Sequence, residues 1–225
     1  ARNPGCDTAQ IAPCGLPTSY AGYALVYCNS SFVDIDADGD YDMYLGDGYG
    51  RILFIENTGT AATPSFGSIT NTAMHTQAQE YFFNISFVDM DGDGDYDAFA
   101  GNEDGELSYF INNGSPTSPS FVLPLSGFNP LDGIVLNDLV YPSFADIDSD
   151  GDFDAFFPNG DWYSEVLFYE NAGTPSSPQF IAPQANPFGL NGFSYYSPPS
   201  FADIDADGDL DVLSGWDGCE LTLQK

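Results

Sequence analysis

Aspartates recur at alternate positions in four short segments of this chain, and these segments have the clearest chemistry in the sequence. They are FVDIDADGDYD (32–42), FVDMDGDGDYD (87–97), FADIDSDGDFD (144–154) and FADIDADGDLD (201–211). In the first segment, loop position 6 is glycine, and positions 1, 3, 5, 7 and 9 are Asp34, Asp36, Asp38, Asp40 and Asp42. Alternate carboxylates on a tightly turning backbone converge on one hard cation, and glycine permits the sharp turn. The spacing therefore predicts four calcium loops, in which position 7 offers its main-chain carbonyl and points its side chain outward.

Two other interpretations of these segments fit less well. A run of aspartates is commonly a solvated, disordered segment. Here, however, each run follows an apolar pair such as Phe32-Val33, has Ile or Met at position 2 and keeps one glycine register. An EF-hand loop needs Glu at position 12 between two helices. Position 12 holds Leu, Ala, Phe and Ser in the four segments, and the flanks lack a helical period.

The net charge argues against two classes of partner. The formal net charge is −31, from 34 acidic residues against three basic ones. Binding to nucleic acid or to an anionic membrane surface needs clustered Lys and Arg. No apolar run approaches the roughly 20 residues that cross a bilayer, and no signal sequence opens the chain. We expect neither nucleic-acid binding nor membrane insertion, and an exported form would have lost its signal before Ala1.

The loops divide the chain into repeats. Their first aspartates are 55, 57 and 57 residues apart, a period typical of stacked or radially arranged units. In each repeat one apolar strand enters the loop and a second leaves it, as at 31–35 and 41–45. Third strands are expected at 52–56, 107–111 and 166–170, and fourth strands begin at 65–66, 120–121 and 179–180. Four short antiparallel strands per repeat are the anatomy of a propeller blade.

The repeated motif resembles a known family. The pattern F-x-D-I-D-x-D-G-D-x-D, followed by a Gly-rich turn and by a segment such as ENAGTPSSPQF (170–180), resembles the FG-GAP or VCBS-type repeat. That resemblance implies an all-β, calcium-binding β-propeller of four-stranded antiparallel blades, as in the integrin α-subunit head and in many bacterial secreted and surface proteins. Propellers of this family usually have more blades than the four loops found here.

The resemblance also implies the Ca²⁺ ligands. One ion per loop, about four in all, would be held by Asp34, Asp36, Asp38 and Asp42; Asp89, Asp91, Asp93 and Asp97; Asp146, Asp148, Asp150 and Asp154; Asp203, Asp205, Asp207 and Asp211. Position 7 would add only a carbonyl oxygen, from Asp40, Asp95, Asp152 and Asp209.

The two ends of the chain look complementary. We expect one domain, 1–225, with repeats at about 30–85, 86–142, 143–199 and 200–225. The last repeat lacks a fourth strand, and AQIAP at 9–13 reads like QFIAP at 179–183, so an N-terminal strand would complete it. Within one chain this pairing closes a four-bladed ring whose last blade is split between the termini. Between chains it makes a head-to-tail contact, which gives a closed oligomer or a filament.

The chain has four cysteines, and none of them forms a CxxC motif or has the Cys/His spacing of a metal site. Their even number and the calcium loops both favour an extracellular location, with reduced buried cysteines as the alternative. Cys219 falls where a third strand begins, and Cys14 directly follows the N-terminal strand, so we expect these two to be bonded. The remaining pair would be Cys6 and Cys28.

No residue pattern indicates catalysis. His75 is the only histidine, with no acid or nucleophile at a readable spacing, and no G-x-S-x-G elbow occurs. We therefore expect a non-enzymatic secreted protein with a structural or adhesion role, which assembles with itself or binds an extracellular protein or glycan. A lectin-like propeller is the alternative, with sugars stacked on Trp162, Tyr163, Tyr195, Tyr196 and Trp216; a polysaccharide-active enzyme has less support.

Three sequons, at Asn29, Asn84 and Asn113, would be N-glycosylated only in a host that uses them.

Overall fold

The fold is built from β-strands. The computed structural model describes residues 19–20, 23–25, 29–47, 49–72, 74, 84–124, 127–134, 136, 140–159, 165–190, 198–216 and 220–224. In these residues the one helical element with defined bounds is a single 3₁₀ turn, η3 (Pro187–Gly189). None of their helical segments has the length and apolar character of a membrane span. The all-β class expected from the sequence is confirmed.

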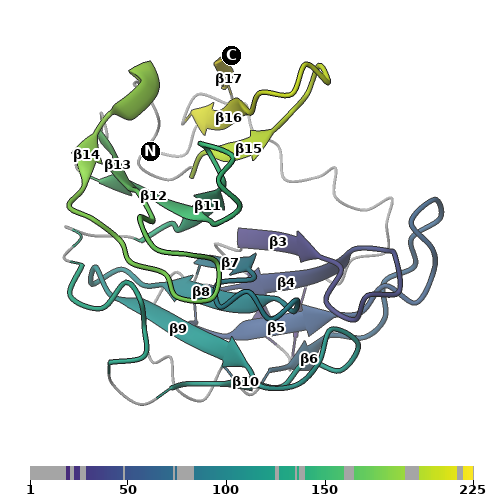
Figure 1. Ribbon diagram of the computed structural model, residues 1–225. Coiled ribbons are helices and arrows are strands. Elements are labelled where there is room, and N and C mark those ends of the chain that lie inside the picture. Colours follow the sequence, from purple (N-terminus) through teal and green to yellow (C-terminus); the bar gives the residue numbers. More distant parts are fainter. Residues whose placement is uncertain are drawn as a thin grey trace.

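Five antiparallel sheets make up the described structure, and four of them each contain an aspartate loop (Figure 1). Sheet 1 contains β3 (Asn29–Val33), β4 (Asp42–Gly46), β5 (Ile52–Ile55) and β6 (Thr70–Asn71). Sheet 2 contains β7 (Asn84–Val88), β8 (Asp97–Gly101), β9 (Leu107–Asn112) and β10 (Phe121–Val122). Sheet 3 contains β11 (Ser143–Ala145), β12 (Asp154–Asn159), β13 (Glu165–Tyr169) and β14 (Gln184–Ala185). Sheet 4 contains β15 (Ser200–Ala202), β16 (Asp211–Trp216) and β17 (Glu220–Gln224), and a separate hairpin pairs β1 (Ser19–Tyr20) with β2 (Tyr23–Ala24).

Side-chain alternation gives each sheet two faces. We call the face toward the next sheet in chain order the forward face and the opposite one the back face; in sheet 4 the forward face is the one that carries the equivalent residues. On the forward face, one residue of the second strand lies directly opposite one of the third. These pairs are Tyr44–Phe54, Phe99–Tyr109, Phe156–Phe168 and Leu213–Leu223 in sheets 1 to 4. In sheets 1 to 3 the paired rings have centroids 4.6–5.0 Å apart and form the centre of the face.

Consecutive sheets pack through one repeated aromatic contact. The forward-face ring on the second strand meets a phenylalanine that stands two residues before the next aspartate loop. The centroid distances are 4.5 Å for Tyr44–Phe87, 4.8 Å for Phe99–Phe144 and 4.5 Å for Phe156–Phe201. Aromatic pairs at this separation contribute about 0.5–1.5 kcal/mol beyond the area they bury. Each contact lies in its own apolar cluster, so three of the apolar clusters among the described residues lie at junctions between sheets, and a further one lies on sheet 1 alone.

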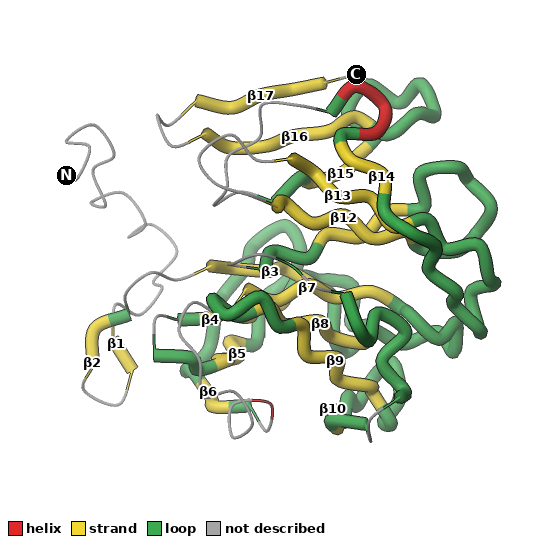
Figure 2. The backbone as a smooth tube through the Cα atoms, turned by 90° about the vertical axis from the view of Figure 1, so that its left-hand side faces the viewer, coloured by secondary structure: helices red, strands yellow, loops and turns green. Residues whose placement is uncertain are grey.

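The first strands of consecutive sheets lie beside one another, β3 by β7, β7 by β11 and β11 by β15. The hydroxyl of Ser86 donates to the carbonyl of Pro142, and the hydroxyl of Ser143 donates to the carbonyl of Pro199, each at 2.5 Å. Figure 2 shows the resulting arrangement, with sheets 3 and 4 above sheets 1 and 2. The first strands thus form the inner line along which the sheets are joined.

The expected strand pattern is confirmed for three complete repeats, with one shift. The fourth strands β6 and β14 begin at Thr70 and Gln184, several residues after the SF and QF dipeptides from which they were expected to start. Phe66 and Phe180 of those dipeptides instead form isolated bridges with Asn57 and Asn171. Sheet 4 has three strands in the described residues. The expected N-terminal strand at 9–13 lies outside them.

Candidate calcium-binding loops

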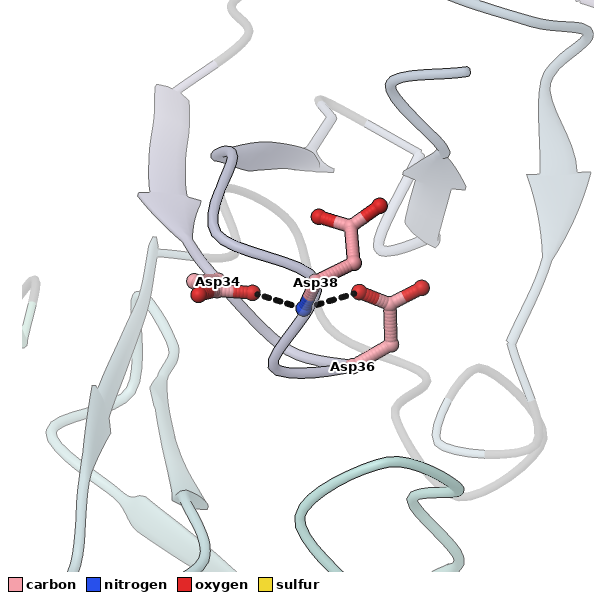
Figure 3. Close-up of side chains that lie close together, drawn as sticks. All are labelled: Asp34, Asp36 and Asp38. Atoms are coloured by element: carbon pink, nitrogen blue, oxygen red, sulfur yellow. Dashed lines mark hydrogen bonds between the residues drawn. The ribbon is translucent and has the colours of Figure 1, made fainter. Parts of the chain in front are cut away.

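Each aspartate loop joins the first two strands of its sheet, and its own carboxylates hold its backbone. In loop 1, the main-chain N–H of Asp38 donates to Oδ1 of Asp34 at 3.1 Å and to Oδ1 of Asp36 at 3.3 Å (Figure 3). The N–H of Gly39 donates to Oδ2 of Asp34 at 3.1 Å, and the N–H of Asp40 donates to Oδ1 of Asp38 at 3.0 Å. Loops 2 and 3 repeat all four bonds, and loop 4 repeats the bonds to positions 1 and 5. These bonds curl the loop around its carboxylates.

Two positions of every loop have left-handed backbone. The glycines at position 6 have φ between 94° and 99°. Position 4 is also left-handed, with φ of 56° at Ala37, 71° at Gly92, 61° at Ser149 and 60° at Ala206. An L-residue in this region costs roughly 1–2 kcal/mol, and small side chains limit that cost. The small residue at position 4 of all four segments is a signal for this backbone that the alternating aspartates alone do not provide.

The carboxylates converge as the spacing predicts. In each of loops 1 to 3, one oxygen from each of positions 1, 3 and 5 lies within 4.8 Å of the others. In loop 4 the converging set is Asp203, Asp205 and Asp211, so position 9 faces the same point as positions 1 and 3. Oxygens that bind one Ca²⁺ at about 2.3–2.6 Å lie at most about 5 Å apart. The described loops therefore have the oxygen spacing of a calcium site.

Position 9 opens the second strand and is buried in all four loops, where Asp42, Asp97, Asp154 and Asp211 are 1–6% exposed. Oδ2 of Asp42 has no hydrogen-bond donor among the described residues. The corresponding oxygen of Asp97 accepts a bond from the hydroxyl of Tyr109 at 2.7 Å. Burial raises the pKa of Asp97 to about 7, and those of Asp42 and Asp154 to about 6, although hydrogen bonds oppose the rise. Without a neighbouring cation, ionising these carboxyls costs more than ionising an exposed aspartate.

An asparagine connects the position-9 aspartate to the turn before the fourth strand. The main-chain N–H of Asn57, Asn112 or Asn171 donates to Oδ1 of that aspartate at 2.7–2.8 Å. In sheet 2, Oδ1 of Asn112 then accepts the N–H groups of Gly114 at 3.1 Å and Ser120 at 2.7 Å. A Cβ on Gly114 would lie 2.2 Å from the carbonyl oxygen of Ser118, so only glycine fits there. The Asn-x-Gly motif thus fastens the outer turn to the loop.

We expect Asn112→Ala to lower the free energy of unfolding by about 1–3 kcal/mol, because two main-chain donors lose their buried acceptor. Urea unfolding followed by circular dichroism measures this loss. Asn113→Ala is the matched control, since the neighbouring Asn113 is exposed and should change stability by less than about 0.5 kcal/mol. Equal effects of the two substitutions would contradict the role of the asparagine side chain.

The expectation that position 7 points outward is wrong in three loops. Asp40, Asp95 and Asp152 are only 6%, 6% and 3% exposed, whereas Asp209 of loop 4 is exposed. Oδ1 of each buried position-7 carboxylate has no hydrogen-bond partner in the described structure. Burial, and then the charges of neighbouring loop aspartates, raise the pKa of all three. Sequence spacing placed these residues in the loop but did not show that the folded structure would bury them.

Several other predicted residues lie outside the described residues. They are Cys6, Cys14, Cys28 and Cys219, His75, and the aromatic residues Trp162, Tyr163, Tyr195 and Tyr196; of Trp216 only the backbone is described. The sequons differ in accessibility, because Asn113 is exposed, Asn29 is half-buried and Asn84 is 8% exposed.

One charged site was not predicted from the sequence. Asp47, fully buried between β4 and β5, accepts bonds from the Nε and guanidinium Nη2 of Arg51 and from the main-chain N–H of Tyr49. This arrangement closes the hairpin turn, and the positive charge of Arg51 offsets the cost of burying the Asp47 carboxylate. The signal in the sequence was an arginine four residues after an aspartate in a chain with only three basic residues.

Comparison with known proteins supports the same class of repeat. The FG-GAP-like repeat family matches residues 146–214, from the third aspartate loop to the middle of β16. The resemblance seen in the sequence is thereby confirmed for this span, which is similar to an FG-GAP-like repeat. No curated protein matches the chain. Among solved structures, a Tc holotoxin pore of Photorhabdus luminescens is similar with a TM-score of 0.42 and 16% identity; the match covers 86% of this chain and 9% of that one.

Proposed function

We propose that this chain is a secreted, calcium-binding propeller-type module with a structural or adhesion role, in which each aspartate loop binds one Ca²⁺. The observation that carries the proposal is the convergence of three carboxylate oxygens within 4.8 Å in every loop, repeated at four equivalent places. Adhesion or assembly through such a module needs no catalytic group. A second feature of the loops points to a cation independently of this convergence.

That second feature is the set of buried oxygens without donors. Oδ2 of Asp42 is buried in the first residue of β4, and loop 4 shows position 9 facing the same point as positions 1 and 3. A buried carboxylate oxygen without a donor is unfavourable unless a cation compensates for it. The donor set contains only oxygen, which suits Ca²⁺, and it is larger than the one or two carboxylates that Mg²⁺ usually takes.

Bound ions would explain how such an acidic chain stays folded. Each loop places five aspartates within nine residues, and like charges at this density repel one another. The ion supplies positive charge at the point where the carboxylates meet. The main-chain N–H groups of the loop donate to the carboxylates of Asp34, Asp36 and Asp38 and so hold these side chains around that point. The sheets would then act as blades, and the calcium-loaded loops would stiffen their inner ends. Loops of this kind bind Ca²⁺ in extracellular fluid, where the concentration of the ion is high.

Calorimetric titration of the calcium-free protein tests the proposal. We expect about four bound Ca²⁺ per chain for the unsubstituted protein, and one fewer for Asp34→Ala, since position 1 also orders the loop backbone. Asp104→Ala is the matched control, because Asp104 is an exposed acid outside the loops and should leave the number of bound ions unchanged. Absence of calcium uptake, or uptake that Asp34→Ala does not alter, would contradict the proposal.

A further inference from the structure

The forward face of sheet 4 differs from the other three forward faces, because its apolar residues are uncovered. Leu223 is 46% exposed and Leu213, opposite it, is half-buried. At the same two places in sheet 3, Phe156 and Phe168 are 0% and 3% exposed. The strands are equivalent, so the difference comes from what packs against them.

The second residue of the aspartate loop shows the same contrast. Ile35 and Met90 are each 3% exposed and lie in the apolar clusters between a sheet and the next one. Ile147 is half-buried against the cluster between sheets 3 and 4. Ile204, its counterpart in loop 4, is 54% exposed. Three apolar side chains of the forward face of sheet 4, Ile204, Leu213 and Leu223, are therefore more exposed than their counterparts in the other sheets. Sheet 4 lies at the upper end of the molecule in Figures 1 and 2.

The complementary half of such a junction is exposed on sheet 1. At each internal junction the forward face is met by the phenylalanine two residues before the next loop, namely Phe87, Phe144 or Phe201. The equivalent residue of sheet 1 is Phe32, and it is 53% exposed. The rest of the back face of sheet 1 is covered: Met43 and Ile55 are buried and pack with Leu25, Phe66 and Ile69. The ring of Phe32 lies 6.4 Å from that of Phe66 between centroids, and the rest of its surface is open to a partner.

We propose that the forward face of sheet 4 in one molecule binds the Phe32 side of sheet 1 in a second copy of this chain, forming a fourth junction of the kind that joins its own sheets. The fold leaves both halves exposed in the same molecule, so a second copy is the occupant that supplies the matching residue. The contact is heterologous, and repeated contacts of this kind give a closed ring or a filament. The inference rests on the proposed role of the sheets as blades, and it names the partner of that assembly.

Sedimentation velocity over a wide range of protein concentrations, in calcium, tests this contact. The unsubstituted chain is expected to form concentration-dependent oligomers. Phe32→Glu and Leu223→Glu should each raise the apparent dissociation constant about tenfold or more, because each places an unpaired charge in the contact. Val122→Glu is the matched control, since Val122 is 39% exposed on β10, away from both faces, and should assemble like the unsubstituted chain.

Mixing the two interfering variants gives a sharper result. Phe32→Glu keeps an intact sheet 4 face and Leu223→Glu keeps an intact Phe32 side, so an equimolar mixture should form one-to-one dimers that neither variant forms alone.

A monomeric unsubstituted chain, or a mixture that stays monomeric, overturns the proposal. Closure within one molecule also overturns it, and would appear as a monomer whose thermal midpoint falls with either substitution. Calcium titration of the same samples shows separately whether the loops bind ions, so failure of assembly and failure of calcium binding are distinguishable.

Discussion

Chelation of calcium is expected to lower the thermal midpoint of this protein by more than about 10 °C. A ligand that binds only the folded state stabilises it by about 2.7 kcal/mol when its concentration is 100 times the dissociation constant. Four loops would add several such contributions, and each kcal/mol shifts the midpoint of a chain of this size by about 2–4 °C. Removal of the ions would also leave buried carboxylates such as Asp42 and Asp97 without compensating charge.

The measurement is differential scanning calorimetry in calcium and in excess chelator. Restoring calcium to the chelated sample should recover the original midpoint, which separates ion removal from irreversible damage. Magnesium at the same concentration should recover much less of it, because Mg²⁺ gives up its water shell reluctantly. An unchanged midpoint in chelator would show that the loops contribute no stability through calcium.

Phe156→Ala is expected to lower the free energy of unfolding by about 3–5 kcal/mol, the range typical of a fully buried phenylalanine. The ring of Phe156 is fully buried, and it contacts Phe168 in its own sheet at 5.0 Å and Phe201 in sheet 4 at 4.5 Å. Truncation opens a cavity at the junction and removes both aromatic contacts. Urea unfolding of the calcium-loaded protein measures the loss.

Leu213→Ala is the matched control for this substitution. Leu213 occupies the same position of sheet 4 but is half-buried, so its truncation removes less buried area and should cost less than about half as much. The comparison is made at a protein concentration where the chain is monomeric. Similar losses for the two variants would mean that the forward face of sheet 4 is as well covered as that of sheet 3.

The amino-acid sequence was sufficient for the local chemistry of this protein. Aspartates at alternate positions with glycine at position 6 determine a curled loop, because carboxylates two residues apart accept the main-chain N–H groups of the same turn. Apolar alternation on both sides of each loop determines the antiparallel strands, and the regular spacing of the loops determines that the unit repeats. These features depend on neighbours within a few residues, so they can be inferred without tertiary structure.

Other features were decided only by packing between distant segments. Asp40, Asp95 and Asp152 are buried, and nothing in the aspartate pattern distinguishes them from the exposed Asp209. Strands β6 and β14 begin later than the sequence predicts, because Phe66 and Phe180 form isolated bridges with Asn57 and Asn171. Alternation shows that a strand has two faces, but not which one meets a neighbour. The contrast between covered Phe156 and half-open Leu213 therefore comes from the order in which the sheets stack, and the tertiary structure alone shows it.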